Sequence, residues 1–141
     1  MDVMQIDVVS NEQNIYSGQV KFAVVPTLNG ELGILPRHEP IMSLVRPGTL
    51  RLQVPDQEDE VLVAISGGIL EVQPDKIMIL ADVAVRSAEL DQARAEEARK
   101  TAEASVAQAK DDEALAKAQA ALAVAIAELK TLDYLRLHKK H

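Results

Sequence analysis

The chain has 141 residues, a formal net charge of −7, one phenylalanine, two tyrosines and no tryptophan. This length allows one ordinary domain, or a small domain with an appendage. The acidic balance and the scarcity of aromatic side chains exclude a nucleic-acid-binding protein, because such a protein needs a basic face and stacking platforms.

Glycine and proline divide the chain into two parts. All six glycines and all six prolines lie between Gly18 and Pro74, and both residue types interrupt helices. Residues 84–141 instead contain seventeen alanines, and Glu, Lys, Arg and Leu make up most of the rest, which is typical of long helices. We therefore predict a β domain over residues 1–86 and a helical domain over residues 87–141.

The first part contains short segments with the two-residue period of β-strands or with a brief apolar run, separated by turn residues. They are Met4–Val9, Ile15–Val25 with a break near Ser17 and Gly18, Ile41–Val45, Leu50–Val54, Val61–Ser66, Ile69–Val72 and Lys76–Leu80, with a loop over Pro26–Gly30. Such segments at intervals of about 8–12 residues favour an antiparallel β sandwich or a flattened barrel. Its core would consist mainly of Val, Ile and Leu, each contributing about 1.5–3 kcal/mol when buried.

The second part predicts two helices. Ser87 is a candidate N-cap for a first helix that ends near Ala109, and Asp111 or Asp112 is a candidate cap for a second. Helical spacing places a stripe of small residues on the first helix: Ala95, Ala98, Ala102, Val106 and Ala109. Seven-residue spacing places a seam on the second: Leu115, Leu122 and Leu129 with Ala118, Ala125 and Leu132. Packing of this seam on the stripe predicts an antiparallel two-helix hairpin.

The predicted hairpin has few large apolar side chains. About six of them would contribute on the order of 10 kcal/mol gross, and the entropy of ordering some fifty residues opposes that gain. We therefore expect a marginal hairpin that can open and dock its seam elsewhere.

No catalytic constellation is recognisable. The histidines are His38, His138 and His141, and the last two are interpreted as solvated tail residues, so no metal site is expected. Ser66-Gly67-Gly68 could form an anion nest, although a bend between strands is the preferred interpretation. Cysteine is absent, which excludes disulfides and fits the cytosol. The start of the chain is acidic, and the longest uncharged apolar stretch, Val61–Leu70, is about half of the ~20 residues that a membrane span needs, so we expect a soluble protein.

Two longer motifs resemble those of a known family. The sequence GELGILP occupies residues 30–36 and is followed by His38 and Pro40, and SGGILEVQP occupies residues 66–74. Both resemble hallmarks of the epsilon subunit of bacterial F-type ATP synthases, and residues 7–10 and 79–82 fit the same family in the expected order. The resemblance covers essentially the whole chain and implies a ten-stranded β sandwich followed by an αα hairpin.

The resemblance implies a place in the central stalk, bound to the gamma subunit and the ring of c subunits. The residues that would face the c ring are Thr27, Leu28, Asn29, Gly30 and Glu31. Those that would lie towards gamma are Ser10, His38 and Glu39. Glu31 would be an acidic contact to polar loops of the ring, although an ordinary turn carboxylate explains its energetics equally well. Arg37 departs from the glycine that is usual in the family.

The resemblance also implies regulation. In bacterial members the hairpin can leave the sandwich, extend along gamma and enter the alpha/beta catalytic hexamer, where it blocks rotation in the hydrolysis direction. The candidate contacts to an acidic loop of the beta subunit are Lys130, Arg136, Lys139 and Lys140. Residues 114–141 carry five basic and two acidic side chains, which suits this role.

A nucleotide-sensing motif of the family resembles the segment containing Leu90, Asp91, Arg94 and Ala95. Positions where tight-binding members carry charged residues correspond to Val85, Val124 and Glu128. Because the charge that would face the phosphates is missing, we expect weak or no ATP binding and no other cofactor.

The leading interpretation is thus a non-catalytic inhibitory rotor subunit, peripheral to the cytoplasmic face of the bacterial inner membrane and associated with it only through the complex. An alternative is a stand-alone ligand-sensing β sandwich with a helical dimerisation tail. An enzyme that uses Ser66 or His38 lacks a base paired with a nucleophile.

Overall fold

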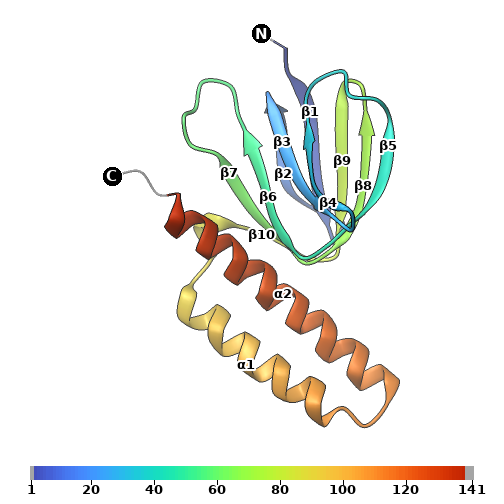
Figure 1. Ribbon diagram of the computed structural model, residues 1–141, viewed down its shortest axis with the longest axis vertical. Helices are drawn as coiled ribbons and strands as arrows, with labels where there is room; N and C mark the ends of the chain where they lie inside the picture. The colour runs from blue at the N-terminus through green and yellow to red at the C-terminus, as the bar shows by residue number, and fades with distance from the viewer. Residues whose placement is uncertain (1, 139–141) are drawn as a thin grey trace.

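The structure, a computed structural model, describes residues 2–138 and contains ten strands followed by two long helices (Figure 1). The strands are β1 Met4–Ser10, β2 Gln13–Val20, β3 Phe22–Thr27, β4 Gly30–Ile34, β5 Ile41–Val45, β6 Gly48–Gln53, β7 Val61–Ile65, β8 Gly68–Gln73, β9 Lys76–Ala81 and β10 Ala84–Arg86. A 3₁₀ turn, Ser87–Glu89, leads to α1 Gln92–Gln108 and α2 Asp112–Leu137. This confirms the predicted fold of a β sandwich and an antiparallel helical hairpin.

The strands form one hydrogen-bonded sheet that folds over on itself. Its order is β10-β7-β6-β3-β5-β8-β9-β1-β2, and β4 pairs with β3 outside this path. All described pairs are antiparallel except β1 and β9, which run parallel from Gln5 opposite Lys76 to Ser10 opposite Ala81. The parallel pair departs from the purely antiparallel arrangement that the sequence predicted. It places the first strand of the chain inside the sheet, between β9 and the edge strand β2.

Three details of the predicted strands are wrong. The break in the second segment lies at Lys21, between β2 and β3, because the Lys21 amide donates to the Gln53 carbonyl (2.7 Å) as the chain passes to the neighbouring strand. Gly18 stays within β2, opposite Ile6. Thr27 ends β3 instead of lying in a loop, and both β4 and β10 were absent from the predicted strands.

Large branched side chains fill the space between the two layers. The largest that are fully buried are Ile6, Ile34, Leu50, Leu52, Ile65, Leu70, Ile77 and Ile79, with Val8, Val20, Val25 and Val63. They come from eight different strands, so the core joins the whole sandwich. This core matches the alternation predicted for β1, β6 and β9.

Several backbone positions in the sandwich adopt conformations that favour glycine, and Gly68 and Arg37 are two of them. Gly68 has a φ of +144°, and a Cβ atom there would lie 2.2 Å from the Leu80 carbonyl oxygen. The Asp82 carboxylate lies beside Gly67, and its negative charge disfavours the binding of an anion at this turn between β7 and β8. Arg37 has a φ of +69°, in the left-handed region that glycine adopts most readily.

Both helices begin at an aspartate. The carboxylate of Asp91 accepts a hydrogen bond from the Arg94 amide (3.1 Å), and that of Asp111 accepts one from the Ala114 amide (2.7 Å). Asp91 is therefore the N-cap of α1. The predicted cap, Ser87, is wrong because it begins the 3₁₀ turn that precedes the helix.

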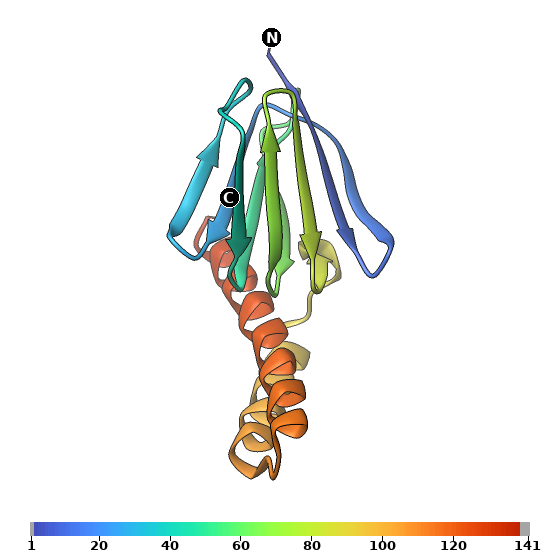
Figure 2. The same ribbon diagram turned by 90° about the vertical axis from the view of Figure 1, so that its right-hand side faces the viewer.

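The hairpin extends away from the sandwich, and only part of α2 lies against the strands (Figures 1 and 2). The buried side chains of α1 are Ala95 and Ala102, and those of α2 are Ala118, Ala125, Ala127 and Thr131. The seam leucines Leu115, Leu122, Leu129 and Leu132 are only half-buried, and Ala98 of the predicted stripe is exposed. The two helices thus meet mainly through alanines, because leucines facing one another would hold their backbones further apart.

Candidate functional site

The turn between β3 and β4 carries the residues that the family resemblance assigns to the c ring. Thr27 is buried, and its hydroxyl donates to the Gly30 carbonyl (2.6 Å) while accepting from the Asn29 amide (3.2 Å). These bonds close the turn, and the Leu28 side chain at its tip is 62% exposed. Thr27 and Gly30 therefore shape the turn, whereas Leu28, Asn29 and Glu31 present side chains at the surface.

Glu31 forms an ion pair with Arg51 of β6. Its Oε1 atom lies 3.7 Å from the Arg51 Nη2 atom, and its side chain remains half-exposed. Burial by itself lowers the pKa of Arg51, but polar and charged neighbours, Glu31 among them, raise it overall. Sequence reasoning did not identify this partner, because the two side chains are twenty positions apart in the chain and lie on different strands, β4 and β6.

Arg51 also contacts the hairpin through Tyr134 of α2. The Arg51 Nη1 atom donates to the Tyr134 hydroxyl (2.8 Å), and the guanidinium lies 5.0 Å from the centre of the tyrosine ring. The Tyr134 hydroxyl in turn donates to Glu60 Oε1 (2.6 Å). Burial and the bond to Glu60 raise the pKa of Tyr134, so the hydroxyl stays protonated and able to donate.

A second polar contact lies one helical turn away. The hydroxyls of Thr49 in β6 and Thr131 in α2 are 2.8 Å apart and buried. Thr131 donates to the Ala127 carbonyl (2.9 Å), so Thr49 donates to Thr131. Directional polar contacts therefore account for much of what holds α2 on the sandwich.

The residues assigned to gamma do not lie together. Ser10 is buried at the end of β1, where its hydroxyl donates to the Asp82 carbonyl (3.1 Å). His38 and Glu39 lie in the loop between β4 and β5, next to Arg37, whose amide donates to the Pro74 carbonyl near the other end of β9. The outer face of β5, β8 and β9 separates the two groups.

That outer face carries a row of exposed apolar side chains. Leu44, Ile69 and Leu80 are direct cross-strand neighbours on β5, β8 and β9, and they are 55%, 44% and 52% exposed. Met42, two residues before Leu44 and on the same face, is 68% exposed. Adjacent exposed apolar residues of this kind mark an interaction surface. We call Met42, Leu44, Ile69 and Leu80 the apolar row.

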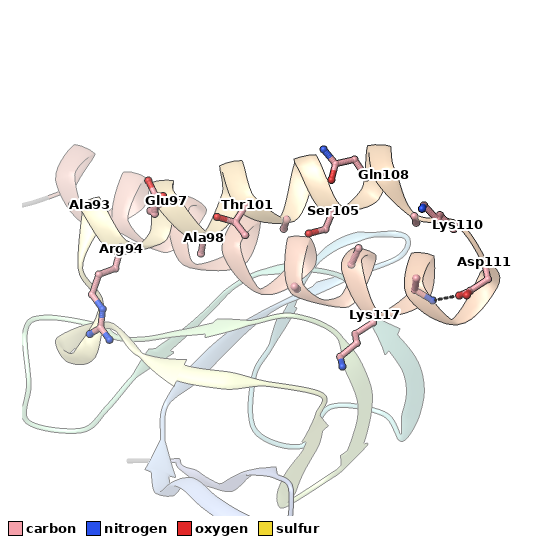
Figure 3. A pocket seen from close by; sticks show the side chains of 15 residues that line it. Ala93, Arg94, Glu97, Ala98, Thr101, Ser105, Gln108, Lys110, Asp111 and Lys117 are labelled. Atoms are coloured by element: carbon pink, nitrogen blue, oxygen red, sulfur yellow. Dashed lines mark hydrogen bonds between the residues drawn. The ribbon is translucent and has the colours of Figure 1, made fainter.

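The nucleotide motif occupies the start of α1, where its acid already has a structural role. Asp91 caps the helix, and Ala95 is buried against α2. In Figure 3 the Arg94 side chain points away from Glu97 and the rest of α1. Burial raises the pKa of Glu128 in α2, and the positive charge of Arg94 partly offsets that increase. A carboxylate within electrostatic range of Arg94, that of Glu128, thus occupies a position where the family resemblance would place a phosphate-binding charge.

A groove of about 1140 Å³ runs between the two helices (Figure 3). Small side chains form its floor, including Ala98, Ala102 and Ala118, and polar residues such as Thr101 and Ser105 lie along its rim. The groove exists because alanines leave space on this face of the hairpin.

The basic residues assigned to the beta subunit are only partly covered by the structure. Lys130 is directed to the sandwich, with Nζ 3.5 Å from the Pro47 carbonyl oxygen. Arg136 pairs with Asp133 on the same helix (3.1 Å) and is exposed. Lys139 and Lys140 lie outside the described residues. In this conformation Lys130 therefore contacts the sandwich.

Within residues 2–138, no three His, Asp or Glu side chains are grouped so that they could hold a metal ion. Neither helix of this described part combines the length and apolar character of a membrane span.

Two family models together match residues 3–133. The β-sandwich domain of the ATP synthase delta/epsilon chain matches residues 3–87, and the long α-helix domain of the same chain matches residues 88–133. The chain belongs to the ATP synthase delta/epsilon family. The two matched domains correspond to the sandwich and to the hairpin.

Full-length relatives place the chain among the epsilon members of this family. The ATP synthase epsilon chain of Neisseria meningitidis serogroup C (strain FAM18) is 74% identical over 99% of this chain and 100% of its own length. That of Neisseria gonorrhoeae is 73% identical with the same coverage, and that of Laribacter hongkongensis is 57% identical over 96% of this chain and 97% of its own. These relatives confirm the family predicted from the two motifs, and they make the protein a subunit of ATP synthase.

Two solved structures share the fold of this chain. A chain of the Euglena gracilis mitochondrial ATP synthase, from a structure of OSCP, F1 and the c ring, matches with a TM-score of 0.73 and 23% identity. The match covers 96% of this chain and 82% of that one. A chain from the central stalk and c ring of the Tetrahymena thermophila enzyme matches with a TM-score of 0.50 and 15% identity, over 82% of this chain and 96% of that one.

Sequence reasoning missed Arg51, Tyr134, the two threonines and the apolar row. The row left a signal, because Ile69-Leu70 and Ile79-Leu80 place apolar residues on both faces of their strands. Tyr134 is one of only two tyrosines in the chain, and it lies in a helix otherwise rich in alanine. Its partner could not be identified without the fold, since Arg51 lies 83 residues away.

Proposed function

We propose that this chain is a central-stalk subunit that links gamma to the c ring of an F-type ATP synthase and inhibits ATP hydrolysis through its C-terminal helices. The observation that carries the proposal is the contrast between a firmly packed sandwich and a hairpin held by alanines and a few polar contacts. Such a hairpin can leave the sandwich without unfolding it. The complex would place the chain at the cytoplasmic face of the inner membrane, as a peripheral subunit without catalytic residues of its own.

The apolar row supports a stable contact with gamma. Its members lie between Ser10 at one end of the sheet and His38 and Glu39 at the other, so a single partner lying along this face reaches both ends. Ile69→Glu places a charge in the middle of the row and should weaken copurification with gamma. Gln53→Glu adds the same charge on an exposed position of β6 and should leave binding unchanged. Equal binding of gamma by both variants would contradict this contact.

The β3–β4 turn supports the contact with the c ring. Leu28 and Asn29 protrude from the sandwich, and the carboxylate of Glu31 is half-exposed beside them. These side chains suit a polar loop of the c ring that offers hydrogen-bond donors to Glu31 and a small apolar surface to Leu28. Leu28→Asp should reduce binding of the gamma–epsilon pair to isolated c rings, whereas Asn14→Asp in β2, on an exposed edge, should not.

The inhibitory role is tested by removing α2. Deleting residues 114–141 should raise ATP hydrolysis by the purified complex, because the segment proposed to enter the alpha/beta hexamer is gone. The sandwich keeps its own core, so the shortened chain should still copurify with gamma. Unchanged hydrolysis in an assembled complex would reject the inhibitory role.

Weak or absent ATP binding is also part of the proposal. The Asp91 carboxylate caps α1, and the Glu128 carboxylate lies within electrostatic range of Arg94, so a nucleotide phosphate would meet a negative charge. Calorimetric titration of the isolated chain with ATP should detect no tight binding. Micromolar affinity would contradict this expectation, and Glu128→Arg is the substitution expected to strengthen binding.

A further inference from the structure

Arg51 is in contact with two parts of the molecule to which the proposed function gives different tasks. Its Nη2 atom is 3.7 Å from Glu31, beside the turn proposed to meet the c ring. Its Nη1 atom donates to the hydroxyl of Tyr134, in the helix proposed to leave the sandwich (2.8 Å). One guanidinium thus bridges the turn and the hairpin.

The surroundings of Arg51 make the two contacts interdependent. Its Nε atom is buried and has no hydrogen-bond partner within the described residues, so its terminal nitrogens alone orient the group. The guanidinium lies over the Tyr134 ring, and the Arg51 side chain is only 24% exposed, so the docked helix reduces its contact with water. Removing water strengthens the attraction between Arg51 and Glu31, and a guanidinium held by Glu31 is correctly aimed at Tyr134.

Glu60 completes the arrangement on the hairpin side. Its Oε1 atom accepts a hydrogen bond from the Tyr134 hydroxyl (2.6 Å). This bond orients the tyrosine oxygen so that it can accept a hydrogen bond from Arg51. One continuous chain of polar contacts therefore crosses the domain interface, from Glu31 through Arg51 and Tyr134 to Glu60. Glu31 is the exposed end of that chain, with half of its side chain accessible to a partner.

We propose that Arg51 couples the β3–β4 turn to the hairpin. While Glu31 pairs with Arg51, the guanidinium holds Tyr134 and α2 stays on the sandwich. A partner that supplies hydrogen-bond donors or a cation to the Glu31 carboxylate draws it from Arg51 and favours release of α2. By linkage, a docked hairpin weakens that partner's hold on the turn by the same factor. The coupling is a property of this chain, and only the identification of the partner as the c ring rests on the proposed function.

The coupling is tested on the isolated full chain with a double-mutant cycle. Opening of α2 is measured by amide hydrogen exchange of residues 114–137 in the wild type, Glu31→Gln, Tyr134→Phe and the double variant. Tyr134→Phe should raise the opening equilibrium roughly ten-fold or more, because two hydrogen bonds to charged groups are lost. Glu31→Gln should raise it roughly two- to five-fold, as expected for a partly exposed ion pair.

The decisive comparison is the double variant. If Arg51 joins the two sites, Glu31→Gln should have little further effect once the Tyr134 hydroxyl is gone. Arg37→Met is the matched control, since it breaks an exposed ion pair with Asp2 (3.7 Å) and should leave α2 unchanged. Exchange of the sandwich amides should be the same in all variants. An unchanged α2 in Glu31→Gln, or effects that simply multiply in the double variant, would overturn the coupling.

Binding to isolated c rings then identifies the partner. Tyr134→Phe should bind the ring more tightly than the wild type, because opening of the hairpin weakens the pairing of Arg51 with Glu31 and leaves the Glu31 carboxylate more available to the ring. Arg37→Met should bind as the wild type does. Equal binding of Tyr134→Phe and the wild type would overturn the coupling to the ring. If no form binds while the exchange cycle shows coupling, the proposed c-ring contact fails and the internal coupling stands.

Discussion

The sandwich and the hairpin bury side chains of very different size. The fully buried residues of the sandwich are mostly isoleucine, leucine and valine, and each contributes about 1.5–3 kcal/mol on burial. Those of the hairpin are alanines and one threonine, whose side chains remove little apolar surface from water. Side chains that are buried to the same degree therefore stabilise the sandwich much more than the hairpin. The sandwich can serve as a scaffold, and the hairpin is an element that can detach from it.

This difference predicts two levels of opening in one short chain. The core amides of the sandwich should exchange only when the whole domain unfolds. The amides of α1 and α2 should exchange through a local opening that has a lower free energy. The polar contacts of Thr131 and Tyr134 then determine where α2 rests more than apolar burial does. Substitutions in the two regions should therefore act on different equilibria.

The largest effect is expected in the sandwich. Leu70→Ala removes a fully buried side chain from β8 and should lower the free energy of unfolding by about 2–5 kcal/mol. Urea unfolding followed by circular dichroism of the sheet measures it. Leu137→Ala, at a position 68% exposed in α2, is the control and should change this free energy by less than about 0.5 kcal/mol.

An intermediate effect is expected where the hairpin meets the sandwich. Thr131→Val leaves the buried hydroxyl of Thr49 without its partner and should destabilise the docked position of α2 by about 1–3 kcal/mol. Amide exchange should show faster opening of α2 with unchanged sandwich protection. The double variant with Thr49→Val should recover part of the loss, because both partners then become apolar. A loss confined to global unfolding would contradict the separation of the two regions.

The sequence predicted the sandwich where apolar alternation is strong and failed where it is absent. β1 and β9 show their buried faces directly, with Ile6 and Ile77 at alternate positions. β4 begins with Gly30 and contains Gly33, so it lacks the usual strand composition, and β10 has only three residues. Both acquire their strand geometry from pairing with β3 and β7.

The surfaces were less predictable than the fold. The exposed tip at Leu28 follows from turn chemistry, but the burial of Thr27 and Ser10 depends on hydrogen bonds that the sequence does not display. Arg51 looks like an ordinary polar position of an alternating strand until the fold places Tyr134 above it. Contacts between residues so far apart in the chain, such as Arg51 and Tyr134, depend on tertiary packing and cannot be inferred from the sequence of either strand or helix.

A smaller effect is expected at the helix caps. Asp111→Ala removes the acceptor of the Ala114 amide and should destabilise the start of α2 by about 1 kcal/mol, seen as faster exchange of its first turn. The neighbouring Asp112→Ala is the control, because its carboxylate is not the cap, and it should have a smaller effect through the helix dipole alone. Equal effects of the two substitutions would contradict the assignment of the cap.

The smallest effect is expected from pH, and here the two regions should respond with opposite signs. In the sandwich, the hydrogen bond from Ser17 and the ion pair with Lys76 hold the pKa of Asp7 below its usual value of 3.8. A depressed carboxyl pKa contributes stability above pH 3.8 that is lost as the pH falls through the folded pKa. Asp7→Asn should therefore flatten the acid side of the sandwich's unfolding curve.

In the hairpin, burial raises the pKa of Glu128 above 4.5, and the charge of Arg94 only partly opposes it. The docked state then binds the proton more tightly than the open state, so its stability is greatest below pH 4.5 and declines as the pH rises through the docked pKa. Glu128→Gln should remove this decline and slow α2 opening at neutral pH. Arg94→Met should deepen it in the wild-type background, because the opposing charge is gone. Exchange of α2 amides against pH in the three chains measures both, and a decline that persists in Glu128→Gln would assign it to another group.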